Sequence, residues 1–442
     1  MAQGPGSEYL GIGLPLPPGN GSWIGEPGLA LAEAVWDDNA RARMPAPDSI
    51  FPRFSDAEYA RRYVAVRAEM AKRGLDAIVA AGDSVFRNSN HANVYWLTNW
   101  LDPYAAYVVV PLTAPPFLVI SNPLYLHHAR RASVISDVIG VYTPGTTIGE
   151  RLDDLGLARG RIGLVGVRHV ARASMPYEHQ RDLAAAMLDA TFENANEVMQ
   201  AARLIKSVEE IAWFEKGAEF TDRAIDGIRE HLRPGMPEYE LSAHIQAAFL
   251  KHGGALMFHF LGTTPMAAPE IIFPWQYPST RVVERGDLLM TEISAGYWGY
   301  CGQIQRAFTV GARPTAEYQR LYELAAEAYH RILAALKPGA TDRDVLAAAR
   351  GIEDAGFKTL DALLHGWGIT IEPPRTDLAV AMIKRELTPF TVEPGMLLVI
   401  QPHVVDPEGR RGVQVGNLVV CEPNGARSLQ KTAMEFFQVG AA

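Results

Sequence analysis

Residues 284–310 read ERGDLLMTEISAGYWGYCGQIQRAFTV and contain two apolar runs with the composition of buried β-strands. The first run is 288–293 and the second is 306–310. Between them, Tyr297-Trp298-Gly299-Tyr300 has the composition of a packed hairpin rather than of a binding platform. The stretch therefore predicts two strands joined by an aromatic hairpin.

Helical and strand-like patterns surround this stretch without alternating. Ser207 is predicted to cap a long helix, with Glu210 as its capping-box partner. Amphipathic helices are expected at 208–232, 238–252, 315–337 and 342–356, and further strands at 396–400 and 413–420. Segregated helices and strands are typical of an α+β domain.

The first half of the chain has a different organisation. A helix is expected from Ser55 to Gly74, and short apolar strands then alternate with helices, which is typical of an α/β domain. These strands are expected at 76–81, 105–110, 116–120 and 161–165. The sequence thus predicts a Gly/Pro-rich extension (1–50), an α/β domain (51–195) and an α+β domain (196–442).

Composition excludes several classes of function. The net charge is −9 and no dense Lys/Arg run is present, so nucleic-acid binding is not expected. The two cysteines, Cys301 and Cys421, have no zinc-site spacing. No secretory signal pattern and no bilayer-length apolar run is present, so we expect a cytoplasmic protein without a membrane partner.

Several motifs, in order, resemble the creatinase / aminopeptidase P / methionine aminopeptidase family. They are Gly74-Leu75-Asp76-Ala77, Asn93–Thr98, Leu204–Ser207 with Glu210-Ile211, Glu284–Leu288, Gly299-Tyr300 through Arg306–Phe308, His365-Gly366-Trp367-Gly368 and Glu393–Met396. The resemblance covers most of the chain. It implies an α/β creatinase/prolidase-like N-terminal domain, an α+β pita-bread catalytic domain and a homodimer.

Metallopeptidases of this family hold two divalent metals on two Asp, one His and two Glu side chains. The corresponding positions in this chain are, in order, Glu292, Gln303, His365, Gln401 and Gly416. Only the histidine is retained, and Glu292 is a conservative change. One carboxylate cannot balance two divalent ions, and amide oxygens are weaker ligands. The resemblance therefore implies a scaffold that has lost its dinuclear metal site, and we expect no cofactor.

Creatinase is the member of the family that works without metal, and the resemblance implies a histidine base with glutamates that hold a guanidinium group. Those glutamates correspond to Gln303 and Gln401, so a cationic guanidinium would lose its counter-charges. A glutamine amide both donates and accepts hydrogen bonds. It suits a neutral amide, a carbonyl or a carboxylate.

Other family positions have changed as well. The substrate-contacting histidines of the family correspond to Trp275 and Glu372 in this chain, while His259 and His403 are candidate replacement imidazoles. Glu372 could also cap the turn before Pro373-Pro374. Glu292 could orient the His365 imidazole, bind a substrate cation, or pair with a nearby arginine, Arg306.

The sequence thus predicts a metal-independent enzyme that hydrolyses a C–N bond in a small polar substrate. His365, Glu292 and Glu372 are the predicted catalytic residues, and Gln303, Gln401, His403, Trp275 and His259 are the predicted substrate-binding residues. Three alternatives remain open at this point. They are a mononuclear metal hydrolase or lyase, an elimination or rearrangement enzyme, and a non-catalytic binding module.

Overall fold

The computed structural model describes residues 51–82, 91–167, 175–378 and 389–440. The predicted N-terminal extension lies outside the described residues. The chain divides into two compact units at Met199/Gln200. This division falls within helix α9 (Asn196–Leu204), which begins directly after the predicted boundary at 195/196.

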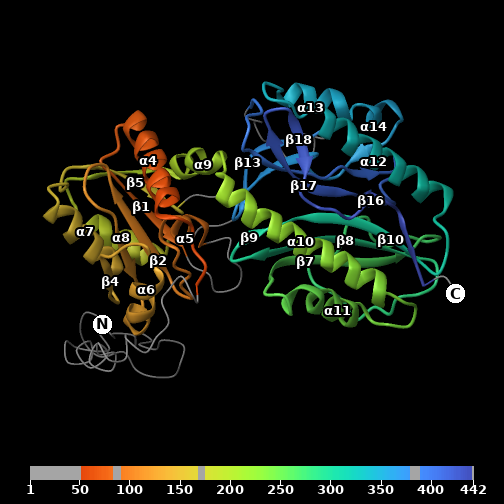
Figure 1. Ribbon diagram of the computed structural model, residues 1–442, viewed down its shortest axis with the longest axis horizontal. Coiled ribbons are helices and arrows are strands. Elements are labelled where there is room, and N and C mark those ends of the chain that lie inside the picture. Colours follow the sequence, from red (N-terminus) through yellow and green to blue (C-terminus); the bar gives the residue numbers. More distant parts are fainter. Residues whose placement is uncertain (1–50, 83–90, 168–174, 379–388, 441–442) are drawn as a thin grey trace, which may run out of the picture. The chain divides into compact units, whose positions relative to one another are not determined.

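The first unit is a mixed six-stranded sheet with strand order β4-β3-β2-β1-β5-β6 (Figure 1). The β1–β2 and β2–β3 pairs are antiparallel, and the remaining neighbours are parallel. The strands are β1 (Ala77–Gly82), β2 (Ala106–Pro111), β3 (Phe117–Ile120), β4 (Val138–Gly140), β5 (Arg161–Val165) and β6 (Thr191–Asn194). The helices are α4 (Asp56–Arg73), α5 (Ala92–Thr98), η2 (Pro123–Tyr125), α6 (Leu126–Ala132), α7 (Pro144–Asp154) and α8 (Tyr177–Ala186). The predicted α/β class of this half is confirmed.

Local signals fix the first helix of this unit. The Ser55 side chain accepts a hydrogen bond from the Glu58 amide, and Gly74 ends the helix with a φ of 64°, a left-handed value that favours glycine. The chain then enters β1, in which every residue is buried. The helix expected from Ser55 to Gly74 and the strand that follows it are therefore confirmed.

The second unit is built on a sheet with strand order β13-β12-β14-β17-β10-β8-β7. Its strands are β7 (Ala255–Pro265), β8 (Asp287–Tyr297), β9 (Tyr300–Cys301), β10 (Ile304–Val310), β12 (Leu364–Trp367), β13 (Ile371–Thr376), β14 (Leu397–Ile400), β17 (Gly416–Glu422), β18 (Gly425–Ser428) and β19 (Phe437–Val439). A small second sheet contains β11 (Lys358–Thr359), β15 (His403–Val405) and β16 (Gly412–Gln414). The helices are α10 (Val208–His231), α11 (Glu238–Leu250), α12 (Ala316–Ala335), α13 (Asp342–Ala349) and α14 (Gly351–Asp354).

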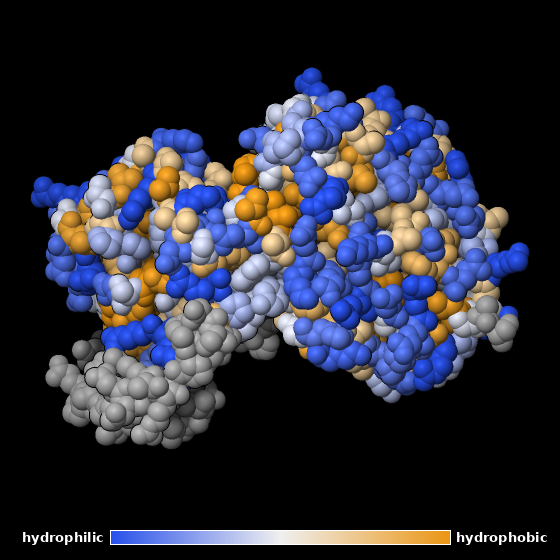
Figure 2. All heavy atoms as spheres, in the orientation of Figure 1, coloured by the Kyte–Doolittle hydropathy of each residue, from blue (hydrophilic) through white to orange (hydrophobic). Residues whose placement is uncertain are grey.

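Helices cover both faces of this larger sheet. On β8, Leu289 and Ile293 pack in the core formed with α10 and α11, whereas Leu288 and Met290 pack in the core formed with α12. This alternation follows the two-residue period of a strand. Figure 1 shows α11 and α12 on opposite sides of the sheet. Over α10 and α11 the outer surface is mainly hydrophilic (Figure 2), as expected for amphipathic helices.

Most predicted elements of the second unit are confirmed, including the capping box in which Ser207 and Glu210 bond to each other's backbone amides. Two expectations are wrong in detail. The predicted helix 342–356 is two helices, α13 and α14, because Gly351 weakens helix continuity at the break. The predicted strand 413–420 is also divided, because the chain passes between sheets at Val415.

Candidate active site

A chain of hydrogen-bonded side chains occupies the positions where the family resemblance implies a metal centre. Gln303 Nε2 donates to Glu292 Oε1 over 2.6 Å and lies 3.2 Å from Gln401 Oε1. Glu292 projects from β8, Gln303 directly precedes β10, and Gln401 directly follows β14. All three side chains are buried. The strand order of the sheet therefore gathers the three residues, although they are distant in sequence.

A third glutamine, Gln305, extends this chain and was missed by the sequence analysis. Its Nε2 donates to Gln401 Oε1 over 2.9 Å. It lies opposite Glu292 in the β8–β10 ladder and opposite Gly416 in the β10–β17 ladder. A Cβ atom added at Gly416 would overlap Gln305 Oε1. The space next to the lost glutamate position is thus filled by an amide. Residues two apart in a strand point to the same face, so its spacing from Gln303 was the sequence signal that could have marked it.

Asp361 is the second residue that the sequence analysis missed. Its Oδ2 accepts from Gln401 Nε2 over 3.0 Å, and its Oδ1 accepts from the Ala362 amide and from Arg375. Arg375 also donates to Asp377 over 3.1 Å. The chain of hydrogen bonds through the buried amides therefore ends at a partly exposed ion pair between Asp361 and Arg375. Asp361 lies in the segment before β12, so no strand pattern marks it.

The protonation of Glu292 is set by this environment. Burial raises its pKa to about 8, and the negative charge of Asp361 adds to the increase, whereas the nearby glutamine amides oppose it. Glu292 is therefore a neutral carboxylic acid at pH 7, with one proton to donate. It does not pair with Arg306, whose guanidinium donates to backbone carbonyls, including that of Gly416.

His365 is buried on β12, and its Nδ1 lies 3.0 Å from the Gly366 carbonyl oxygen. Burial lowers the pKa of the imidazole, while the Gly366 carbonyl, Asp361 and Gln401 oppose that shift. A neutral ring with its proton on Nδ1 donates to this carbonyl and leaves the Nε2 lone pair as an acceptor. The arrangement is suitable for a general base.

Glu372 does not join this group. Its carboxylate lies 2.9 Å from Arg203 Nε and 3.0 Å from Lys206 Nζ, and all three side chains are buried. In the β12–β13 ladder Glu372 lies opposite Gly366, next to an irregularity in the register between His365 and Gly366. Because of this irregularity, the residues after His365 do not keep the regular alternation of faces along the strand. The carboxylate of Glu372 is thus bound by two cations, and no hydrogen bond between it and the His365 imidazole is found among the described residues.

The two replacement imidazoles lie in different surroundings. His403, on β15, stacks on Phe273 at a ring separation of 5.3 Å, and burial lowers its pKa to about 4. His259, on β7, has Nδ1 3.3 Å from Ser242 Oγ, and burial lowers its pKa to about 4 as well. Both rings are neutral at pH 7. The negative charge of Asp361 opposes the lowering of the His403 pKa.

Trp275 lies on the segment between β7 and β8, and half of it is exposed. It forms an isolated β-bridge with Leu261. The segment also carries Phe273, the stacking partner of His403. Trp275 is therefore at the surface, while Phe273, which the sequence analysis did not select, contacts the buried group.

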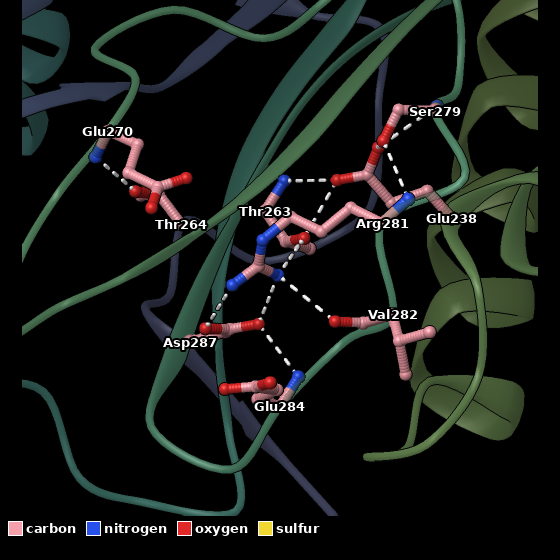
Figure 3. A network of polar contacts seen from close by, with 9 residues as sticks. All are labelled: Glu238, Thr263, Thr264, Glu270, Ser279, Arg281, Val282, Glu284 and Asp287. Carbon is pink, nitrogen blue, oxygen red and sulfur yellow. Dashed lines mark hydrogen bonds and ion pairs between the residues drawn. The ribbon is translucent and has the colours of Figure 1, made fainter.

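A network centred on Glu238 fixes this segment (Figure 3). Glu238 is fully buried; its Oε1 accepts from the amide and hydroxyl of Thr263, and its Oε2 accepts from the amide and hydroxyl of Ser279. Arg281 links Thr263 to Asp287 through contacts of 2.6 and 2.5 Å. A buried carboxylate with four donors is strongly held. The network therefore anchors the segment between β7 and β8.

The donor set does not fit a dinuclear metal centre. Across the described residues, no three His, Cys, Asp or Glu side chains are grouped so that they could hold a metal ion. At the family positions, a neutral carboxylic acid and two amides that bond to one another take the place of carboxylates. Hard divalent cations prefer charged oxygen ligands.

Comparison with known proteins identifies the family. The model of metallopeptidase family M24 matches residues 212–423, and that of the creatinase/prolidase N-terminal domain matches residues 62–205. An Xaa-Pro dipeptidase of Pyrococcus furiosus is 31% identical over 248 residues, which cover 55% of this chain and 68% of that protein. The chain belongs to metallopeptidase family M24. A creatinase of a Bacillus species is 23% identical to this M24 protein over 411 residues, covering 87% of this chain and 93% of that protein.

Solved structures support the same fold for this M24 protein. The Xaa-Pro dipeptidase of Bacillus anthracis aligns with a TM-score of 0.70 at 22% identity, covering 86% of this chain and 100% of that chain. The predicted creatinase-like N-terminal domain and pita-bread C-terminal domain are therefore confirmed. The comparisons support an M24 hydrolase, peptidase-like or creatinase-like. No helix within the described ranges has both the length and the hydropathy to cross a membrane.

Proposed function

We propose that this M24 protein is a metal-independent hydrolase that cleaves a C–N bond in a small polar substrate. The observation that carries the proposal is that a neutral imidazole, His365, and a neutral carboxylic acid, Glu292, lie at the two ends of a glutamine pair. Gln303 donates to Glu292 and to Gln401, and Gln401 bonds to His365. Environments that hold one group as a base and another as an acid at the same pH are the usual basis of acid/base catalysis.

The two groups have different parts in the proposed reaction. Nε2 of His365 takes a proton from water, and the water oxygen bonds to the carbonyl carbon of the substrate. Glu292, as a neutral acid, donates a hydrogen bond to the carbonyl oxygen as negative charge develops there. The C–N bond then breaks, and the His365 imidazolium returns its proton to the leaving nitrogen. Water is consumed, and a carboxylic acid and an amine are formed.

The donor chemistry supports metal independence. Xaa-Pro dipeptidases are among the relatives of the chain, and the family name denotes metallopeptidases. In this chain, however, Gln303 uses its amide nitrogen on Glu292, and Gln401 uses its amide on Asp361. Metal binding would have to break these bonds and deprotonate Glu292. We therefore assign the glutamines to substrate positioning.

The family resemblance and the composition further suggest that the protein acts on its small-molecule substrate as a homodimer in the cytoplasm. Light scattering of the purified chain tests the dimer: a mass near twice 48.4 kDa supports it, and a mass near 48.4 kDa contradicts it.

Turnover in water enriched in heavy oxygen tests the reaction type. Chelator-treated protein is incubated with a panel of small amides and with a metabolite extract, and the products are followed by mass spectrometry. Hydrolysis places one heavy oxygen in the new carboxylic acid, and His365→Ala abolishes the product. A product without heavy oxygen indicates elimination or rearrangement, and turnover only after metal addition indicates a metal hydrolase. No turnover by the wild type would favour a binding module.

A further inference from the structure

Buried polar atoms without hydrogen-bond partners gather beside the network already described. Among the described residues, no side-chain partner or backbone partner is found for Nδ1 of His403, for either amide atom of Gln414, or for the Oε1 atoms of Gln303 and Gln305. All four side chains are at most 2% exposed. Such atoms are costly to bury, and native proteins leave few of them unsatisfied. We call these four residues the polar cluster.

The strand register, together with the contacts of β16 with β10 and β8, brings the members of the polar cluster into one region. His403 and Gln414 are direct partners in the β15–β16 ladder, so their side chains leave the same face of that pair. The hairpin of β15 and β16 departs after Gln401 and returns to the main sheet at Gly416. Gly416 pairs with Gln305, which itself donates to Gln401. The cluster thus continues from the proposed catalytic network.

Two contacts fix the imidazole at the outer end of the cluster. Phe273 stacks on His403, and the Ile272 carbonyl oxygen faces the ring. A Cβ atom added at Gly412 would lie 2.7 Å from His403 Nε2, so glycine is required for the ring to fit there. The imidazole is therefore held in one orientation, with Nδ1 available to a ligand.

The chemistry of the cluster selects for a neutral ligand. The free groups are amide and imidazole atoms, which offer several acceptors together with the donor of Gln414. No member carries a carboxylate that would balance a cation, and Asp361, which Gln401 contacts, is already paired with Arg375. The nearby Arg375 is bound by Asp361 and Asp377, so it is engaged and unsuited to balance an anion. A planar group with N–H donors beside a carbonyl acceptor complements such a surface.

We propose that the polar cluster binds a neutral carboxamide group of the substrate. This inference deepens the proposed function and rests on it, because the carboxamide is placed next to His365 and Glu292. Ordered water would satisfy the same atoms in the free protein, and the ligand would displace it.

Acetamide, acetate and acetamidinium test the charge preference, because they have similar shapes and differ in charge. Protein labelled with nitrogen-15 in His and Gln side chains is titrated with each compound, and the shifts of the His403 and Gln414 signals give the Kd. We expect acetamide to bind at least about ten-fold more tightly than either ion. Equal affinity for the three compounds, or shifts confined to other side chains, would overturn the proposal.

Two variants sharpen the test. Gln414→Met removes both amide partners with little change in volume and should weaken acetamide binding about ten-fold. Gln414→Glu introduces a carboxylate and should turn the preference toward acetamidinium. Gln319→Met is the matched control, because Gln319 lies on α12 with its amide on Glu323 at the surface. If Gln414→Met does not fold, the wild-type titration decides alone.

The outcomes separate this inference from the proposed function, because binding is measured without turnover. If acetamide binds at the cluster but no amide is hydrolysed, the site stands and the hydrolase proposal fails. If a charged substrate is hydrolysed with His365 as base while acetamide does not bind, the hydrolase stands and the carboxamide site fails.

Discussion

Gln303 Nε2 lies 2.6 Å from Glu292 Oε1, across two neighbouring strands of the main sheet. At this contact an amide meets a carboxylic acid, in a place where the family relationship implies two acids sharing a metal. In the proposed metal-independent site, the proton on Glu292 and the amide donor of Gln303 take the place of metal charge. Glu292 and the glutamines at 303, 305 and 401 are then linked into one buried network.

Stability should fall with rising pH because of Glu292. Its folded-state pKa of about 8 lies above the ordinary value of 4.5, so its favourable contribution to folding is fully present below about pH 4.5 and is lost as the pH rises through about 8. The loss should reach a few kcal/mol, at about 1.4 kcal/mol per pKa unit. Denaturant unfolding of wild type and Glu292→Gln from pH 5 to 9 measures it; parallel pH profiles for the two proteins would contradict the account.

The rate should depend on pH through the same two groups. Burial lowers the pKa of His365 below the ordinary histidine value of about 6.5, so the imidazole stays neutral at pH 6.5 and somewhat below it. Loss of the Glu292 proton should reduce kcat/KM above about pH 8. Glu292→Gln keeps a neutral donor and should remove the alkaline decline while retaining activity. An alkaline limb that persists in this variant would assign the limb to another group.

Restoring carboxylates should restore metal binding in part. The double variant Gln303→Asp with Gln401→Glu places two acids beside Glu292 and His365, and we expect it to bind one divalent ion. The position of Gly416 would still lack a ligand, because Gln305 fills the space there. Isothermal titration with Mn²⁺ or Zn²⁺ measures the stoichiometry, and Gln319→Glu is the surface control. No gain of affinity over wild type would contradict this assignment of the positions.

Glu372 should matter for stability rather than for proton transfer. Glu372→Ala removes the carboxylate shared by Arg203 and Lys206, and the loss of a buried partner of this kind costs about 3–5 kcal/mol. Glu327→Ala breaks an exposed pair with Arg331 and should cost under about 1 kcal/mol. Thermal unfolding compares them. A stable Glu372→Ala protein with greatly reduced turnover would return Glu372 to the catalytic group.

Local signals explain what the sequence could predict. Ser207 and Glu210 form their capping box within one turn of helix, and the strands around Glu292 carry their apolar pattern in a few residues. The positions of Gln303, His365 and Gln401 follow from family order. Asp361 could not be selected in this way, because its contact with Gln401 depends on how distant segments pair, and Gln305 was marked only by its spacing from Gln303.

The ion pairs of Glu372 could not be predicted from the sequence for a similar reason. The family spacing of seven residues from His365 assigned Glu372 to the pocket. The irregularity between His365 and Gly366, however, interrupts the alternation of side chains between the two faces of the strand. The cations that bind it, Arg203 and Lys206, come from a segment more than a hundred residues earlier, a pairing that no local pattern encodes.

The metal content of the purified wild type tests the central claim most directly. The chain is produced in medium supplemented with zinc, manganese and cobalt, purified without chelator, and analysed by mass spectrometry of the elements. The account predicts far less than one metal ion per chain, and unchanged activity after chelator treatment. One or two ions per chain, with activity that is lost on their removal and regained on their return, would contradict it.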